Sequence, residues 1–236
     1  MEEKLTGLVL SKTDYGENDR IIKIFTLEKG TVSAVLKGVK KSGAKLKFAS
    51  EPFCFAEFLL SERAGRRTVT GASLNDSFYP VREDVIRFFA AGTVLEFIRC
   101  FAKENITSPN LFFCAIECLK EISYGSVPPK RALSVFLLSA LKISGYALNT
   151  DGCFKCGKEI DGRVFFDSQS GGFLCERCFN GVGREINFAT FISLNKIENG
   201  ETVSEEESVY ALRLLDFYIK NKAEEKLSSL QELLKM

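Results

Sequence analysis

Cys153-Phe154-Lys155-Cys156 and Cys175-Glu176-Arg177-Cys178 are two C-x-x-C motifs with eighteen residues between them. Each motif can supply two thiolates from one tight turn, and four thiolates at about 2.3 Å complete the tetrahedral shell that Zn²⁺ prefers. Disulfides and free core cysteines are the alternatives. A closed four-thiolate shell leaves no open position for substrate or water, so the expected metal is structural. The spacing predicts one Zn²⁺ per chain, bound by Cys153, Cys156, Cys175 and Cys178.

The residues between the two motifs favour a small sheet. Gly157 follows the first pair, and Asp161-Gly162 and Gly171-Gly172 are turn sequences. These turns flank Val164-Phe165-Phe166 and Phe173-Leu174, which we expect to form short strands. The pattern predicts a zinc ribbon at about residues 151–180 that packs against the rest of its domain. The other cysteines lie among apolar residues and are expected in the core rather than in a second metal site; they are Cys54, Cys100, Cys114 and Cys118.

The first eighty residues alternate in the manner of short strands. Five strands in about eighty residues suggest a small closed barrel, which leaves no open edge. We expect an OB-type β-barrel at residues 1–80 that binds nucleic acid. An SH3-like barrel and a plain sandwich without a ligand groove are the alternatives. The five β-branched or aromatic runs are Leu5–Leu10, Arg20–Thr26, Gly30–Leu36, Pro52–Ser61 and Arg67–Gly71.

A basic stretch, the lysine segment (residues 37–47), lies between the third and fourth of these runs. It carries five lysines and no acidic residue, and its glycines and serine indicate a mobile loop. Ammonium groups so close together repel one another unless an anion screens them, and a phosphate backbone releases counterions when it binds. A solvated surface is the alternative, but the neighbouring barrel favours DNA. The predicted phosphate contacts are Arg20, Lys37, Lys40, Lys41, Lys45 and Lys47.

The lysine segment contains no aromatic residue. Aromatic side chains are what single-strand-binding proteins use to stack bases. We therefore expect this segment to contact phosphates without reading bases, and to tolerate both single- and double-stranded DNA.

After Tyr79-Pro80 the apolar period changes from two to about 3.6, and we place a domain boundary there. Capping serines and proline pairs mark several of the helix starts that follow. The predicted helices lie at 85–101, 108–123, 128–145, 189–196, from 204 onward and at 227–236. The predicted fold is α+β, with a five-stranded OB-type β-barrel followed at 81–236 by an α-helical domain carrying the four-cysteine zinc ribbon.

Histidine is absent from all 236 residues. This excludes Ser-His and Cys-His nucleophile pairs, His-ligated metals and the H-x-E motif of zinc deaminases within this chain. A non-enzymatic role is expected, although Lys, Asp, Glu or Tyr chemistry stays open. No segment approaches the roughly 20 apolar residues of a membrane helix, and no signal-like run begins the sequence. We expect no membrane partner and a cytoplasmic, nucleoid-associated location.

Several short motifs occur in a specific combination and spacing along the whole chain. They are Gly7–Leu10, Tyr15–Arg20, Phe25-Thr26, Gly30, Lys37–Lys41, and Ile143–Tyr146 running into Cys153-x-x-Cys156-Gly157. Together these motifs resemble the bacterial RecO recombination-mediator proteins. The resemblance implies an N-terminal OB fold, a C-terminal helical domain with a zinc ribbon, and a role in recombinational DNA repair.

The resemblance also implies activities and partners. Members of that family bind single- and double-stranded DNA, anneal complementary strands, associate with RecR and with the single-strand-binding protein SSB, and help load RecA on SSB-coated gaps. Some members lack the cysteines. This chain has all four, so metal binding carries over residue by residue. The positions that bind protein partners match no motif sharp enough to transfer, and the family adds no catalytic residue.

The C-terminal tail of SSB, which is acidic with an apolar end, would need a hydrophobic groove rimmed by cations. We expect the helical domain to supply it, because several cations lie on or beside helices rich in Phe and Leu: Arg99, Lys103, Lys130 and Arg131. Two other function classes are the alternatives to a DNA-binding mediator. One is a protein-adaptor module that docks through barrel and ribbon without significant direct DNA binding. The other is a hydrolase or transferase using Asp and Lys, which turnover of ATP or DNA would reveal.

Overall fold

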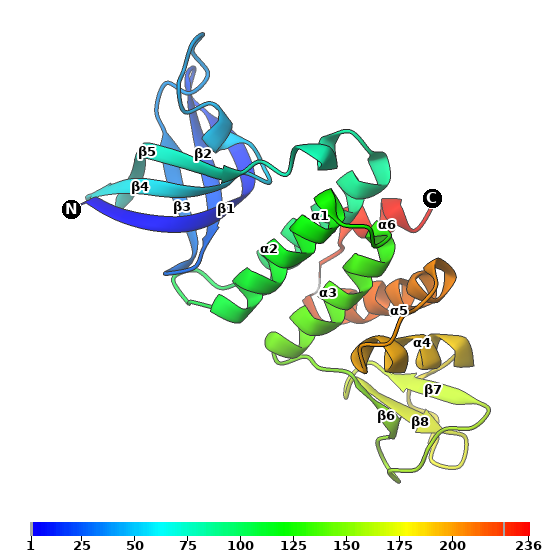
Figure 1. Cartoon of the computed structure of the whole chain (residues 1–236). Helices are drawn as coiled ribbons and strands as arrows, with labels where there is room; N and C mark the ends of the chain where they lie inside the picture. Colours follow the sequence, from blue (N-terminus) through cyan, green and yellow to red (C-terminus); the bar gives the residue numbers. More distant parts are fainter. Residues whose placement is uncertain (1, 224) are drawn as a thin grey trace.

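The computed structural model describes residues 2–223 and 225–236 and begins with a closed barrel of five strands (Figure 1). The order around the barrel is β1-β2-β3-β5-β4, which confirms the expected OB-type barrel. Neighbouring strands are antiparallel except β3 and β5, which are parallel. The strands are β1 (Glu2–Tyr15), β2 (Asp19–Thr26), β3 (Gly30–Leu36), β4 (Phe55–Arg63) and β5 (Arg66–Asp76).

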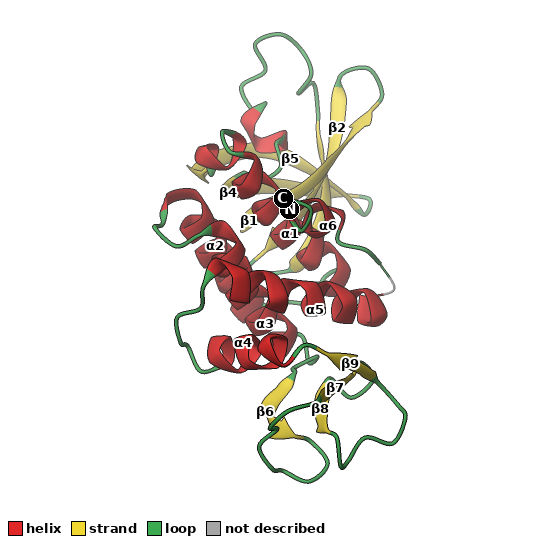
Figure 2. Cartoon of the chain, turned by 90° about the vertical axis from the view of Figure 1, so that its right-hand side faces the viewer, coloured by secondary structure: helices red, strands yellow, loops and turns green. Residues whose placement is uncertain are grey.

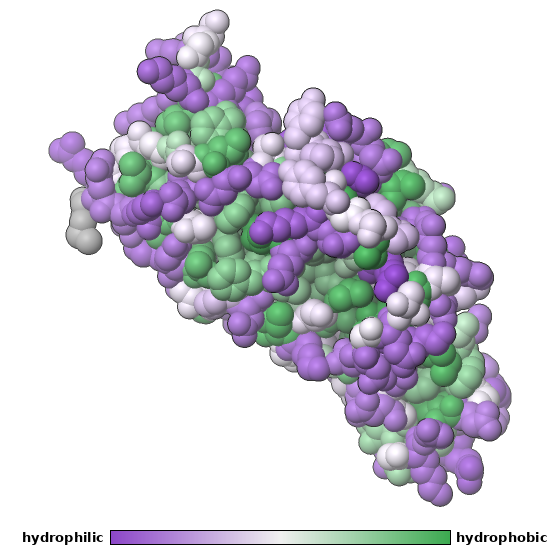
Figure 3. All heavy atoms as spheres, viewed as in Figure 1, coloured by the Kyte–Doolittle hydropathy of each residue, from purple (hydrophilic) through white to green (hydrophobic). Residues whose placement is uncertain are grey.

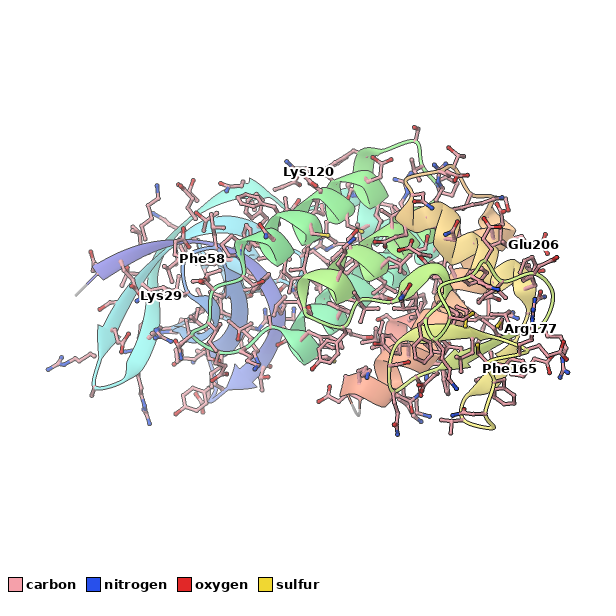
Figure 4. All side chains as sticks on the ribbon, turned by 90° about the horizontal axis from the view of Figure 1, so that it is seen from below. Lys29, Phe58, Lys120, Phe165, Arg177 and Glu206 are labelled. Carbon is pink, nitrogen blue, oxygen red and sulfur yellow. The ribbon has the colours of Figure 1, made fainter. Side chains whose placement is uncertain are left out.

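The barrel core forms from alternate residues of its strands. Ile22 and Ile24 of β2 point inward, as does Phe58 of β4, which Figure 4 labels within the barrel. Strand β1 is different, because Leu8, Val9 and Leu10 are all buried. Val9 belongs to the barrel core, whereas Leu8 and Leu10 on the other face belong to the core shared with the helices. A continuous apolar run is what a strand buried on both faces requires.

Within the described residues, six α-helices follow the barrel and form the middle of the molecule (Figure 2). Three of these helices begin with a capping side chain. The Asp84 carboxylate accepts a hydrogen bond from the Arg87 amide, and the Asn187 side-chain carbonyl accepts one from the Ala189 amide. Ser204 and Glu207 form a capping box, in which the amide of each residue donates to the side chain of the other. Ser108 precedes the second helix as expected, but its side chain makes no capping bond. The helices are α1 (Val85–Phe101), α2 (Pro109–Tyr124), α3 (Pro129–Ile143), α4 (Phe188–Glu198), α5 (Glu205–Ala223) and α6 (Ser228–Leu233).

The ribbon is a four-stranded sheet at the end of the molecule opposite the barrel (Figures 1 and 2). Its strand order is β6-β8-β7-β9. The last strand, β9, ends at Ile186, so the sheet extends a few residues beyond the expected end near 180. The ring centroids of Phe166 and Tyr218 lie 5.6 Å apart, and those of Phe173 and Phe191 lie 5.1 Å apart. The ribbon therefore packs on α5 and α4, as expected. Its strands are β6 (Asn149–Cys153), β7 (Val164–Asp167), β8 (Gly172–Cys175) and β9 (Arg184–Ile186).

The barrel and the helices also share apolar contacts. Phe112 of α2 lies with its ring centroid 5.5 Å from that of Phe25 and 6.1 Å from that of Phe55, which belong to β2 and β4. The turn between β2 and β3 contacts the segment after α1, where Glu104 forms backbone bridges with Gly30 and Thr31. One buried cluster therefore runs from the barrel surface through the helices to the ribbon.

Candidate metal centre and nucleic-acid interface

The four cysteines of the two C-x-x-C motifs form one cluster, in which the sulfur atoms of Cys153, Cys156, Cys175 and Cys178 lie within 4.8 Å of one another. A tetrahedral site with metal–sulfur bonds of about 2.3 Å needs sulfurs roughly 3.8 Å apart, so small side-chain rotations suffice. Two turns hold the ligands, since the Gly157 amide donates to the Cys153 carbonyl at 2.7 Å and the Cys178 amide to the Cys175 carbonyl at 3.0 Å. Within the described residues, this is the only metal-sized group of three or more Cys, Asp or Glu side chains.

The thiols of the cluster differ in their protonation. Burial opposes ionisation of Cys153, but hydrogen bonds from the backbone of Cys175, Cys156 and Lys155 outweigh it and lower its pKa to about 6. Cys178 shows the reverse, because a hydrogen bond with the Cys156 side chain raises its pKa to about 12. Cys153 is thus stabilised as a thiolate, whereas Cys178 holds its proton more firmly. A cation in the cluster would displace that proton, so this donor set fits a metal ion.

The remaining cysteines divide into two pairs. Cys54 and Cys118 are buried, as expected, and burial raises the pKa of both thiols. Cys100 and Cys114 are only half-buried, so they lie at the edge of the core rather than inside it. The Cys100 thiol lies 3.3 Å from a carboxylate oxygen of Glu225.

The lysine segment leaves the barrel at the end of β3, and all five of its lysines are exposed. Its first residues are more ordered than the sequence suggests. The Gly38 amide donates to the Asp19 carboxylate at 2.7 Å, the Lys40 amide donates to the Asn18 carbonyl at 3.0 Å, and Val39 is buried. The turn between β1 and β2 therefore anchors the start of the segment.

Two of the predicted phosphate contacts already have carboxylate partners. The Lys40 ammonium lies 2.8 Å from Asp14, and the Arg20 guanidinium contacts Asp14 and Glu51, each at 3.0 Å. Hydrogen bonds from Lys40 and Arg20 hold the pKa of the Asp14 carboxyl below its usual value. The sequence shows no acid inside the segment, but folding brings Asp14 of β1 to Lys40, and brings Asp14 and Glu51 to Arg20. Within residues 2–223 and 225–236, no ion pair is found for Lys37, Lys41, Lys45 and Lys47.

The four cations expected around a helical-domain groove do not gather at one place. Arg131 lines a groove of about 420 Å³ between α2 and α3, together with apolar residues that include Val135 and Phe136 and with the acids Glu117 and Glu121. Figure 3 shows apolar side chains on this part of the surface. The other cations do not line it. Lys130 is buried with its ammonium 3.6 Å from Glu205, and Arg99 and Lys103 lie in and after the last turn of α1.

Comparison with known proteins covers both parts of the chain. The family model described as "Recombination protein O N terminal" matches residues 1–78, and the model described as "Recombination protein O C terminal" matches residues 82–231. The chain belongs to the RecO family. The break between the two models falls near the expected domain boundary.

Similar proteins share the name "DNA repair protein RecO". The one from Anaeromyxobacter sp. (strain K) is 34% identical over 203 residues, which cover 84% of this chain and 79% of the relative. The one from Bacillus subtilis (strain 168) is 31% identical over 179 residues, which cover 76% of this chain and 69% of the relative. The one from Clostridium perfringens (strain 13 / Type A) is 27% identical over 234 residues, which cover 96% of this chain and 95% of the relative. In the part of this RecO-family chain that the structure describes, no helix has the length and apolarity to cross a membrane.

Proposed function

We propose that this chain is a non-enzymatic mediator of recombinational DNA repair that binds single- and double-stranded DNA. The observation that carries the proposal is the exposed lysine segment at the end of a closed barrel in a RecO-family chain. The segment brings positive charge to a small surface, which attracts phosphates of either strand form without regard to sequence. Bound to chromosomal DNA, the protein would act in the cytoplasm on the nucleoid.

The unequal pairing of the cations assigns them different roles. Lys37, Lys41, Lys45 and Lys47 make the first phosphate contacts, because they give up no carboxylate partner on binding. Lys40 and Arg20 contact phosphate only by exchanging their existing partners, Asp14 and Glu51, so they add less affinity. Their present ion pairs hold the base of the segment against the barrel.

Further activities of the proposed mediator follow from the family. It anneals complementary strands, associates with RecR and SSB, and helps RecA to load on SSB-coated DNA. Its four-cysteine cluster binds one Zn²⁺ that stabilises the fold and leaves DNA contact to other residues. Zinc is favoured because four thiolates in two C-x-x-C turns form the usual closed structural site, whereas a tetrahedral iron–sulfur site is the other metal chemistry that such ligands accept.

A salt titration tests the DNA-binding proposal. In the full chain, Lys41→Ala combined with Lys45→Ala should flatten the slope of log affinity against log salt by about 1.4 for single strands, or about 0.7 per lost contact. The matched control is Lys120→Ala combined with Lys220→Ala, which removes the same charge from exposed positions on α2, where Figure 4 labels Lys120, and on α5.

The titration also separates the function classes. If the folded Lys41→Ala, Lys45→Ala variant has the same salt slope as the control variant, the lysine segment does not contact phosphates. Absence of DNA binding by the unchanged chain would favour the adaptor alternative. Turnover of ATP or DNA by a metal-loaded sample would contradict the non-enzymatic role.

A second proposal concerns the acidic tail of SSB, for which the groove between α2 and α3 is the candidate. Arg131 is the cation of a groove that also holds apolar side chains and the acids Glu117 and Glu121, and it can bind the terminal carboxylate while the apolar residues receive the apolar end of the tail. Arg131→Ala should weaken binding of a tail peptide to the full chain about tenfold, since a charge-assisted hydrogen bond contributes about 1.5–3 kcal/mol. Arg99→Ala, which removes a cation on α1 outside the groove, is the control. Equal losses in the two variants would place the tail elsewhere.

A further inference from the structure

The four-cysteine cluster is open to solvent on one side. A cavity of about 440 Å³ lies against it, and three of its four cysteines, Cys156, Cys175 and Cys178, line that cavity. Charged side chains complete the lining, among them Arg177, which Figure 4 labels on the ribbon. A cavity with such walls admits water and small water-soluble molecules. A reactant dissolved in water can therefore reach sulfur atoms of the cluster.

The four cysteines differ in their protection from such a reactant. Cys153 is only 1% exposed, and its sulfur accepts hydrogen bonds from backbone amides. Cys175 and Cys178 are half-buried, whereas Cys156 is exposed. Oxidation of cysteine follows thiolate character and exposure. Cys156 is therefore the position at which an oxidant meets the cluster first.

The cysteines outside the cluster are poor competitors for an oxidant. Cys54 and Cys118 are buried. Cys100 and Cys114 are half-buried, and burial raises the pKa of their thiols to about 12 and about 11. Both therefore stay protonated at neutral pH, and it is the thiolate that reacts. Oxidation should thus be selective for the cluster.

A second cysteine lies close enough to Cys156 to complete a disulfide. Cys153 belongs to the same C-x-x-C turn, which the Gly157 amide closes by donating to the Cys153 carbonyl at 2.7 Å. The two sulfurs lie within 4.8 Å of each other, so they need only a small movement to reach the S–S bond length of about 2.05 Å. The C-x-x-C turn is also the arrangement in which disulfide oxidoreductases form their disulfide.

We propose that Cys156 is a site of oxidation by hydrogen peroxide, and that Cys153 then forms a disulfide with it and opens the metal cluster. In the first step the Cys156 thiolate attacks one peroxide oxygen; an S–O bond forms, the O–O bond breaks and hydroxide leaves. In the second step the Cys153 thiolate attacks the Cys156 sulfur; an S–S bond forms, the S–O bond breaks and a second hydroxide leaves. The two thiolates together lose the two electrons that the peroxide gains.

The disulfide removes two of the four ligands that a Zn²⁺ ion would have, so the cluster no longer completes a tetrahedral shell. The rest of the ribbon does not depend on these sulfurs, because Phe166 packs on Tyr218 and Phe173 on Phe191. The change is therefore confined to the two C-x-x-C turns, and a thiol reductant with fresh Zn²⁺ should reverse it. This inference rests on the proposed zinc site and adds a redox response to it.

The test treats the zinc-loaded full chain with hydrogen peroxide. A colorimetric chelator should detect release of the zinc, and mass spectrometry of alkylated peptides should locate a disulfide between Cys153 and Cys156. Cys156→His keeps four ligands, because imidazole also binds Zn²⁺, but it removes the exposed sulfur and should slow zinc release about tenfold. Cys178→His is the matched control. It keeps both Cys153 and Cys156, and should release zinc at the rate of the unchanged chain.

Equal release rates in the two histidine variants would overturn the proposal. So would a disulfide at another pair, or a Cys156 that is still free to be alkylated after the zinc has left. If a histidine variant does not fold with zinc, the disulfide located in the unchanged chain decides the matter. An unchanged chain that holds no zinc but forms the Cys153–Cys156 disulfide would contradict the zinc site and support the oxidation site.

Discussion

At the scale of single residues, the cysteine cluster shows why four ligands act as one unit. Cys153 is buried and stabilised as a thiolate by backbone amides, whereas Cys156 is exposed and Cys175 and Cys178 are half-buried. No single sulfur in such a set forms a site alone. A metal ion bound by all four would hold them together, and its binding free energy would then contribute to folding.

We predict that Cys175→Ser lowers the zinc content of purified protein well below one ion per chain. The free energy of unfolding should fall by about 3 kcal/mol or more, since loss of a structural metal is among the largest single-residue effects. Elemental analysis and denaturant unfolding measure the two effects. Cys114→Ser, at a half-buried cysteine outside the cluster, should keep its zinc. Iron in place of zinc, or no metal in the unchanged protein, would contradict the zinc assignment.

The sequence predicted the cysteine cluster because its spacing encodes a local geometry: two tight turns joined by a hairpin. It could not show that Lys40 pairs with Asp14, or Arg20 with Glu51, because those contacts join residues 26 and 31 positions apart in the chain. Nor could the sequence show that barrel closure places Tyr15, Val35 and Arg66 around one groove, because these residues come from three different strands.

At the scale of elements, the strand ends show how far the pattern of apolar residues predicts strand length. The bounds of β3 match the expected run, because Gly30 and Leu36 mark clear ends of an apolar stretch. Strand β1 extends to Tyr15, well past the expected end at Leu10, because its polar half pairs with β2 in the antiparallel ladder. Backbone pairing lengthens a strand through residues whose side chains give no signal.

Gly30 offers a test of how the β2–β3 turn joins the barrel to the helical part. Its φ is +66°, and an added Cβ would lie 2.0 Å from the carbonyl oxygen of Ile106. Gly30→Ala should therefore lower the free energy of unfolding by about 3 kcal/mol, from left-handed backbone strain together with the collision. Gly16→Ala is the matched control, because its φ is +62° but nothing lies within 4 Å of the added atom. It should cost only about 1 kcal/mol. Equal costs in denaturant unfolding would show that the contact with Ile106 contributes nothing.

At the scale of the whole molecule, the two predicted domains are joined by packing as well as by the chain. The barrel has its own core around Phe58, yet its outer face contributes Leu8, Leu10 and Phe25 to the cluster that fills the helical part. Sequence periodicity predicts a boundary near residue 80 because the strand pattern gives way to a helical one there. It could not show that apolar residues on both sides of this boundary meet, which explains the solid run of apolar residues in β1.

This arrangement predicts that Phe112→Ala, although the residue lies on α2, destabilises the barrel as well. Phe112 contacts Phe25 and Phe55, so its removal opens a cavity between the two parts and should cost about 3–5 kcal/mol. Amide hydrogen exchange should then quicken in β2 and β4 as well as in α2. Phe58→Ala removes an equally buried ring from the separate barrel core, and should quicken exchange in the strands while α2 keeps its protection. If Phe112→Ala affected the helices alone, the barrel would be an independent unit, and the shared apolar surface would position the DNA-binding face without stabilising it.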